Sequence, residues 1–216
     1  MDEEKNLLNR VRESGKLFED FDFLPTRKSL YYDDQKPPAY DGDVHTSVHW
    51  LRPSELSEEA DYLSGVNEEQ MVGERGTISD IISTRIDDSF LVSAIASLAI
   101  HEGGHLLEKI VKSEIEDVLD HGVFSCSFYK NGSWITCSVD TKLPCSPSAD
   151  PSSKPLPLYA HSVNKNEFLI PLIEKAYAKV CFVGFYTTDE MVCCLLCYRF
   201  MVPTKLSTRG GLSEMP

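Results

Sequence analysis

The chain has 216 residues, of which 42% are hydrophobic, enough for one ordinary globular domain with a sizeable core. Its formal net charge of −13 argues against nucleic acid and anionic membrane surfaces as default partners. Seven cysteines form an odd number without the regular spacing of a disulfide framework, and no apolar segment follows the acidic first residues. We therefore expect reduced thiols in a cytoplasmic protein without a secretory signal.

The first part of the chain predicts a helix followed by an extended strap. Leu7, Leu8 and Val11 recur at helical spacing among charged residues, which indicates a short amphipathic helix in an N-terminal extension over residues 1–16. Residues 17–32 carry aromatic side chains and proline without periodicity, as is typical of an extended segment lying over a core.

The run from Phe90 to Ile100 carries almost only apolar or small residues. It shows no polar face at any helical phase, so we expect a central helix that is buried on every side. The run is too short to span a bilayer, which takes about 20 apolar residues, and we expect no membrane span. Asp87 and Asp88 stand where side chains can cap helical N–H groups, which places Ser89 in the first turn.

The second half of the chain predicts a further helix, a hairpin and a loop. Apolar residues recur at helical spacing from 106 to 119. Two alternating runs, 123–128 and 133–139, flank Asn131-Gly132, a strong β-hairpin signal. Residues 145–157 are rich in serine and proline and predict a surface loop.

Several blocks of the sequence, in a consistent order, carry the motifs of one enzyme family. The segment 83–98 fits Gln-Gly-x-x-Gly-Asp-Cys-Trp-Leu-x-Ala through Asp88, Phe90, Leu91, Ala94, Ser97 and Leu98. The segment 161–179 fits His-Ser-x-x-x-Asn-Glu-Phe-Trp followed by Leu-Leu-Glu-Lys-Ala-Tyr-Ala-Lys, and 50–53 and 139–144 fit two shorter blocks. With these motifs the chain resembles the calpains, the calcium-dependent intracellular cysteine endopeptidases.

The resemblance implies an α+β fold, the N-terminal lobe of a papain-like cysteine protease, with a buried central helix and a small antiparallel sheet beside it. It covers residues 17–179, the first lobe of the calpain-like catalytic core. The family's catalytic histidine and asparagine belong to a second lobe that the resemblance does not reach. Residues 180–216 do not follow the family pattern, and we expect a divergent, poorly ordered tail from truncation or alternative processing.

The same resemblance places two substitutions at catalytic positions. Ser89 stands where the family has its nucleophilic cysteine, and Ser83 stands where it has the oxyanion-hole glutamine. Losing one oxyanion donor alone costs about 10²–10³ in rate. We therefore expect a catalytically inactive pseudopeptidase lobe with a regulatory or binding role. Two alternatives remain, a serine hydrolase that uses Ser89 with an adjacent general base, and a truncated non-functional product.

The resemblance also implies a calcium site and protein partners. Asp80 and Glu167 fall on two calcium-binding carboxylates of the family, and two carboxylates with a few carbonyl oxygens would make a weak calcium site. The partners expected are substrate or binding proteins, together with self-association through the lobe face left uncovered by the missing half.

Three further motifs have simpler explanations. His101-Glu102-Gly103-Gly104-His105 has the letters of a zinc-protease motif, but adjacent glycines disfavour the continuous helix that zinc binding needs and indicate a helix end. Cys194 and Cys197 form a single CxxC without a second ligand pair. Asn131-Gly132-Ser133 fits a glycosylation sequon, but the hairpin turn explains it.

Overall fold

The computed structural model describes residues 2–26, 29–30, 48–62, 81–82, 89–100, 105–130, 132–147 and 154–184. Helices and small antiparallel sheets alternate along this part of the chain, which agrees with the mixed α and β structure expected from the sequence. Its elements are α1 (Asp2–Ser14), β1 (His49–Leu51), α2 (Pro53–Leu56), β2 (Ile81–Ile82), α4 (Ser89–Ile100), α5 (His105–Ile110), α6 (Ile115–Leu119), β3 (Val123–Lys130), β4 (Ser133–Asp140), β5 (Leu143–Ser146), β6 (Leu156–Pro157), β7 (His161–Ser162) and α7 (Leu169–Gly184).

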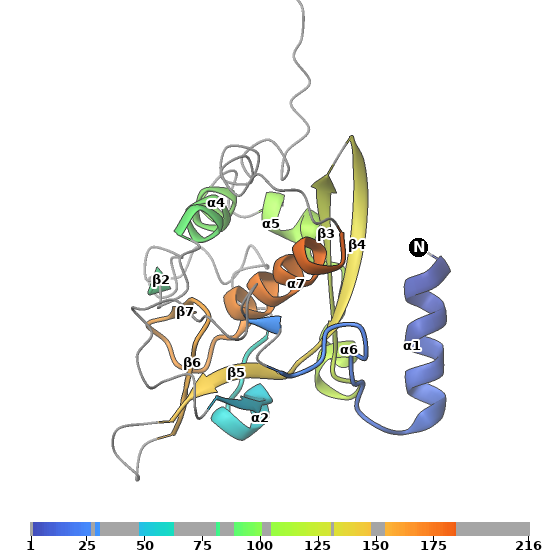
Figure 1. The fold of residues 1–216 in the computed structure, drawn as a ribbon, viewed down its shortest axis with the longest axis horizontal. Coiled ribbons are helices and arrows are strands. Elements are labelled where there is room, and N and C mark those ends of the chain that lie inside the picture. Colours follow the sequence, from blue (N-terminus) through green and yellow to red (C-terminus); the bar gives the residue numbers. More distant parts are fainter. Residues whose placement is uncertain are drawn as a thin grey trace, which may run out of the picture.

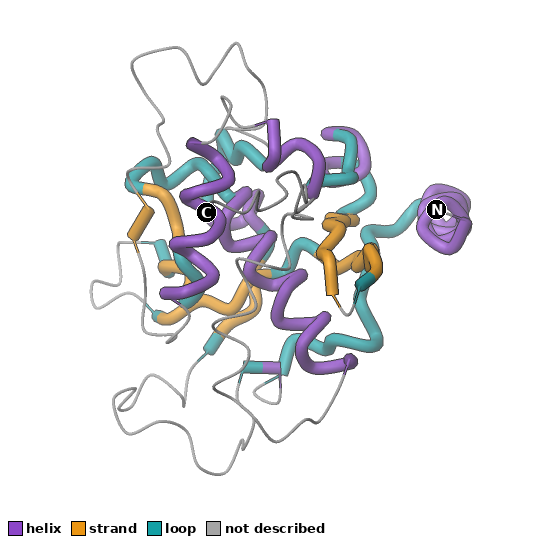
Figure 2. The backbone as a smooth tube through the Cα atoms, turned by 90° about the horizontal axis from the view of Figure 1, so that it is seen from above, coloured by secondary structure: helices purple, strands orange, loops and turns teal. Residues whose placement is uncertain are grey.

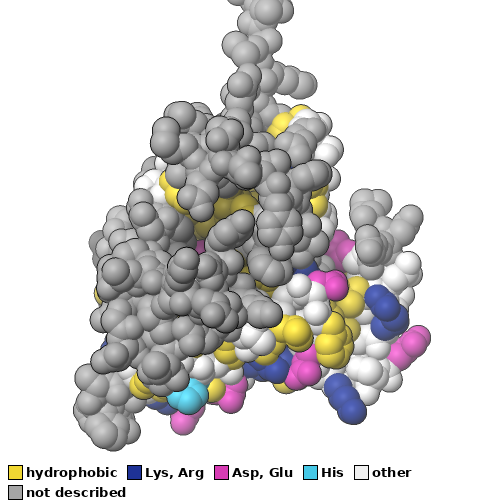
Figure 3. Space-filling model, viewed as in Figure 1, with side chains coloured by type: hydrophobic (Ala, Val, Ile, Leu, Met, Phe, Trp, Pro, Cys, Tyr) yellow, Lys and Arg dark blue, Asp and Glu magenta, His cyan; other side chains and the backbone are white. Residues whose placement is uncertain are grey.

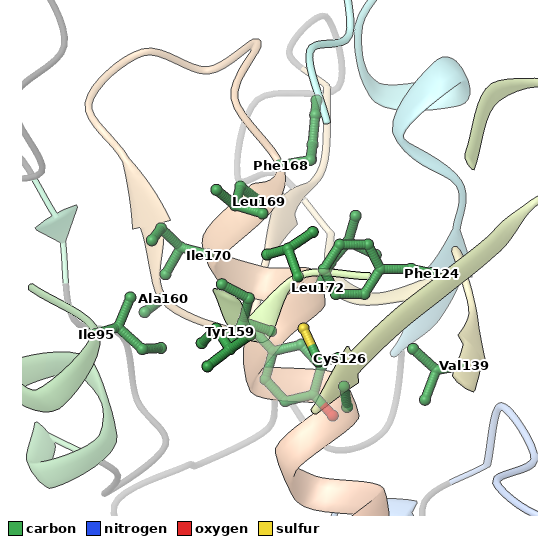
Figure 4. Close-up of a cluster of buried hydrophobic side chains, with 14 of the residues drawn as sticks. Ile95, Phe124, Cys126, Val139, Tyr159, Ala160, Phe168, Leu169, Ile170 and Leu172 are labelled. Atoms are coloured by element: carbon green, nitrogen blue, oxygen red, sulfur yellow. The ribbon is translucent and has the colours of Figure 1, made fainter. Parts of the chain in front are cut away.

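Helix α7 lies at the centre of the molecule, between the β3–β4 hairpin and α4 (Figure 1). Its Tyr177 ring makes edge contacts with Phe90 of α4 and Phe128 of β3, at centroid distances of 6.3 Å and 5.6 Å. Leu172 and Ile173 are fully buried and pack in one cluster with side chains of the hairpin and α4 (Figure 4). Each such buried aliphatic side chain stabilises the fold by about 1.5–3 kcal/mol, so α7 is the main core element.

Helix α4 begins at Ser89, as the sequence predicts. It is not buried on every side, because Ser93 and Ser97 are exposed while Leu91 and Ile95 are buried. The Ser97 hydroxyl donates to the Ser93 carbonyl at 2.8 Å, so this face meets solvent without losing hydrogen bonds. The expectation of burial on every side is wrong at these two positions, because serine is small and also polar enough to face solvent.

Residues 105–119 form two short helices, α5 and α6, instead of one helix. Between them Val111 makes an antiparallel bridge with Cys126, and the Lys112 amide donates to the Ser125 carbonyl at 2.9 Å. The chain therefore leaves the helical conformation here and pairs with the edge of β3 that does not face β4. Helix α4 ends at Ile100 and α5 begins at His105, as the paired glycines between them predict.

The predicted hairpin is present as β3 and β4, with Lys130 opposite Ser133 across a two-residue turn. Gly132 in this turn has φ +84°, a conformation that glycine adopts without strain. Residues Val123 to Phe128 of β3 are buried without interruption, so both faces of this strand are covered.

Two smaller β units complete the fold. Strand β5 pairs with β1 and β6 in an antiparallel three-stranded sheet, and β2 pairs with β7. The loop predicted for 145–157 is shorter than expected, because Cys145 and Ser146 belong to β5 and Leu156 and Pro157 to β6. Strand pairing overrides the local turn signal there.

The N-terminal residues form the predicted amphipathic helix and a partly buried strap. Helix α1 stands beside the hairpin and apart from the other helices (Figures 1 and 2), and Arg12 joins it to Asp117 of α6 at 2.9 Å. In the strap Phe23 is only 1% exposed, whereas Phe21 and Leu24 are exposed. Phe23 is therefore a buried anchor of the strap, and Leu30, further along it, packs against the main core cluster.

Candidate active-site residues and the buried charge network

The position of the expected nucleophile is the first residue of α4. Ser89 begins this helix, where the dipole makes the backbone electropositive. The side chain of Ser89 and the residues Ser83 and Asp80 lie outside what the structure describes. Their assignments as nucleophile, oxyanion and metal positions therefore stay predictions.

Glu167, the second expected calcium ligand, lies in the turn between β7 and α7. Its Oε1 accepts a hydrogen bond from Asn164 Nδ2 at 2.9 Å, and its residue makes a parallel bridge with Asp61. The Asp61 carbonyl accepts from the Phe168 amide at 2.8 Å, which fixes the end of this turn. Glu167 is half-buried, and the hydrogen bond from Asn164 is a contact of its carboxylate.

Pairing of β2 with β7 brings the two expected metal segments together. Ile81 pairs with Ser162 and Ile82 with His161. Asp80 directly precedes β2, and Glu167 follows β7 by five residues. Within the described residues no group of three or more histidine, cysteine, aspartate or glutamate side chains could hold a metal ion. Glu167 is one carboxylate of suitable chemistry for calcium, which would need further oxygen ligands such as backbone carbonyls.

Two lysines on one face of α7 form the main electrostatic feature that the sequence reading missed. Lys175 and Asp140 form a salt bridge at 2.6 Å, with both side chains 1% exposed. The Lys175 ammonium also donates to the carbonyls of Asp140 at 2.9 Å and Lys142 at 2.6 Å, so its three donors have three acceptors. Burial lowers the pKa of Lys175, and the neighbouring Asp140 carboxylate opposes this effect.

Lys179, one turn further along α7, ties the strap to the hairpin. Its ammonium donates to Asp20 Oδ2 at 2.7 Å and to the Ser138 carbonyl at 2.8 Å. The Asp20 amide in turn donates to Asp140 Oδ2 at 3.0 Å. Asp20, Asp140, Lys175 and Lys179, which we call the charge network, therefore join the strap, β4 and α7.

Arg52 fixes the other end of the strap. Its two terminal nitrogens donate to Thr141 Oγ1 at 2.6 Å and to the Phe18 carbonyl at 2.7 Å. Gly122, with φ +67°, leaves room for the guanidinium, because a Cβ there would lie 2.7 Å from Arg52 Nη1. In the sequence, the only sign of the charge network is the spacing of four residues between Lys175 and Lys179. The only sign of the Arg52 contacts is the Arg52-Pro53 turn. Neither reveals its acidic or carbonyl partner without the fold.

The three buried cysteines are poor candidates for a replacement nucleophile. Burial raises the pKa of Cys137 and of Cys145 to about 12 and raises that of Cys126 well above its usual value. A thiol must ionise to act as a nucleophile, so these three remain inert at neutral pH. In the structure these three cysteines are free thiols in the core.

The histidines with described side chains give no evidence of a base near α4. Helix α4 packs against α5 and α7. His49 lies on β1, His121 follows α6, and His161 lies on β7, where its Nδ1 is 3.3 Å from the Tyr159 carbonyl. None of these three side chains comes from a helix that packs on α4.

Comparison with known proteins identifies the family. The model of the calpain family cysteine protease domain matches residues 18–191. Calpain clp-1 of Caenorhabditis elegans is 31% identical over 175 residues, which cover 81% of this chain and 19% of that protein. Human calpain-8 is 31% identical over 179 residues (82% and 22%), and the mouse calpain-2 catalytic subunit is 29% identical over 177 residues (82% and 22%).

The chain belongs to the calpain family of cysteine proteases, so the resemblance read from its motifs is confirmed at the level of the family. It spans about a fifth of the length of these relatives, 19% to 22%. The family match continues past Lys179 to residue 191, and α7 continues to Gly184. In the described part of the chain, none of the helices combines the length and apolarity needed to cross a membrane.

Proposed function

We propose that the chain is a catalytically inactive first lobe of a calpain-type, papain-like protease core that acts in the cytoplasm by binding other proteins. The observation that carries this proposal is a serine at the first position of α4, in a chain of the calpain family. The family's cysteine is activated by ionisation, which a helix N-terminus promotes. A serine hydroxyl gains much less from that position and needs an adjacent general base.

The fold supports a binding role because its framework does not depend on the catalytic positions. The charge network joins the strap, hairpin and α7 through buried groups on other elements. A lobe of this kind can fold and present a surface without performing chemistry. Its partner would be a protein, either one of the kind that an active protease of this family would cleave or a second copy of the chain.

A protease assay tests this proposal. The full chain, Ser89→Cys and Ser89→Ala are each incubated with fluorogenic casein in millimolar calcium and in chelator. We expect no calcium-dependent cleavage by the parent or by Ser89→Ala, because neither has the family's cysteine. We expect none by Ser89→Cys either, because Ser83 stands at the oxyanion position and the family's catalytic histidine belongs to the second lobe. Cleavage by the parent that Ser89→Ala abolishes would establish the serine hydrolase instead. Cleavage by Ser89→Cys alone would show that the remaining machinery is present.

Calcium binding forms a separate part of the proposal. Calorimetric titration of the full chain is expected to show weak binding that is lost in an Asp80→Asn, Glu167→Gln double variant, because calcium needs several oxygen ligands including carboxylates. Glu13→Gln, which changes an exposed acid on α1, provides the matched control. Equal heats from the parent and the double variant would remove calcium from the proposal and leave the inactive binding lobe unaffected.

A further inference from the structure

Residues of α1 and β4 line a broad groove. These two elements stand on the side of the molecule away from α4 (Figure 1). The groove has a volume of about 1580 Å³. Leu7 and Val11 of α1 line one wall, Trp134 to Ser138 of β4 lie opposite, and Val180 near the end of α7 closes one part. We call this feature the α1–β4 groove. It is separate from the start of α4, so it does not belong to the expected catalytic region.

The groove is rich in exposed apolar side chains. Leu17, Phe21, Trp134 and Ile135 line it, and each of them is exposed, Phe21 by 79%. Apolar side chains also reach the surface beside the charged residues of α1 in Figure 3. Scattered exposed apolar residues are ordinary, but a group of large ones lining one concave surface marks a site of interaction.

The outer edge of β4 supplies main-chain hydrogen-bonding groups to the same groove. Because Lys130 and Ser133 flank a two-residue turn, residues 133, 135, 137 and 139 bond to β3, and residues 134, 136, 138 and 140 point their main-chain groups outward. The carbonyls of Ser138 and Asp140 bear this out, since Lys179 and Lys175 bind them from outside the hairpin. No described strand pairs with β4 at Trp134 and Thr136. An exposed edge of this kind accepts an added strand.

The segment of this chain that best suits the groove is 191–202, with the sequence Met-Val-Cys-Cys-Leu-Leu-Cys-Tyr-Arg-Phe-Met-Val. It contains a single charged residue, Arg199, and is rich in residues that favour strands. The lining of the groove is of mixed charge, with Lys and Arg outnumbering Asp and Glu, so the match rests on its exposed apolar side chains. By contrast, 31–47 and 63–80, the other long segments outside the described residues, are rich in acidic and polar residues.

The connection is long enough. Val180 already lines the groove, and α7 ends at Gly184. Residues 185–190 span up to about 20 Å when extended. An added strand lies only about 4.8 Å from the strand with which it pairs, so this linker can bring the segment to the edge of β4. We propose that Met191–Val202 binds in the α1–β4 groove as an extended strand along the outer edge of β4. In that position the segment covers the apolar side chains of the groove and pairs with the outward groups of Trp134 and Thr136.

Residue-resolved hydrogen exchange of the full chain tests the pairing. Leu195→Asp with Phe200→Asp places a charge on each face of the segment, and Ser207→Asp with Thr208→Asp adds the same charge beyond it. We expect the amides of Trp134 and Thr136 to exchange at least about tenfold faster in the first variant than in the parent or the control. The amides of Ile135 and Cys137, which bond to β3, should not change. Equal rates at Trp134 and Thr136 in all three proteins would overturn the proposal.

Disulfide trapping identifies the occupant without depending on the stability of the Asp variants. Thr136→Cys is oxidised in the full chain, and disulfides are mapped by mass spectrometry in the monomer fraction. We expect links from residue 136 to Cys193, Cys194 or Cys197, because a disulfide requires Cα atoms within about 7 Å. Val163→Cys, at an exposed site on the turn after β7, should give none. Links found only between chains, or none to the segment, would contradict the proposal.

Discussion

Asp140→Asn is expected to destabilise the protein by about 3–5 kcal/mol, because it leaves the buried Lys175 ammonium without its counter-charge. Both side chains of this pair are 1% exposed, so water cannot replace the lost carboxylate. In the parent, Asp140 Oδ1 accepts from the Lys142 amide and Oδ2 accepts from the Asp20 amide. Asparagine replaces one of these oxygens by an NH2 donor, so one of the two hydrogen bonds is also lost. The measurement is urea unfolding followed by circular dichroism.

Two further variants separate the buried charge from general disruption. Asp140→Asn with Lys175→Met is expected to be more stable than Asp140→Asn alone, because the uncompensated ammonium is gone. Glu19→Gln removes the exposed partner of Lys142 and should leave the unfolding midpoint nearly unchanged. If the double variant proved less stable than Asp140→Asn, the cost would arise from packing around α7 rather than from the unpaired charge.

The parts of the fold that could be predicted from the sequence were those determined by local patterns. Asn131-Gly132 identified the hairpin of β3 and β4, and the spacing of Leu7 and Val11 identified α1. The start of α4 at Ser89 followed from an apolar run behind two aspartates. Each of these depends on neighbours in the chain, which a single sequence displays.

Long-range contacts account for what the sequence did not reveal. The break between α5 and α6 arises from Val111 pairing with Cys126, a contact that helical periodicity cannot show. The exposed face of α4 at Ser93 depends on which elements surround that helix. The charge network brings Asp20 to Lys179 across 159 residues of sequence, so only the fold makes them partners. Of the candidate site, the sequence supplied the identity of Ser89 and Glu167, and the structure added their places at the start of α4 and after β7.

These observations together explain how a lobe can keep its fold while its chemistry changes. The strap, the hairpin and α7 are held by buried pairs and by core side chains at positions remote in sequence from Ser89. A serine at the start of α4 removes the ionisable thiol without disturbing any of these contacts. The identity of the residue at the start of α4 and the contacts that hold the fold together are thus physically independent in this chain.

The strap offers a direct test of this framework, because adjacent residues lie on opposite sides of it. Phe23→Ala is expected to cost about 3–5 kcal/mol of stability, since Phe23 is 1% exposed and its removal leaves a cavity. The amide of Phe23, which donates to Asp20 Oδ1 at 3.2 Å, is unaffected by the change, so the loss reports side-chain burial. The measurement is again urea unfolding.

Leu24→Ala is the matched control, in the neighbouring residue. Leu24 is 49% exposed, so we expect a loss of at most about 1 kcal/mol. Similar losses in both variants would mean that the strap does not lie on the core as Phe23 places it. A large loss at Phe23 alone would show that one aromatic side chain and the Asp20–Lys179 pair beside it hold the N-terminal segment to α7 and the hairpin.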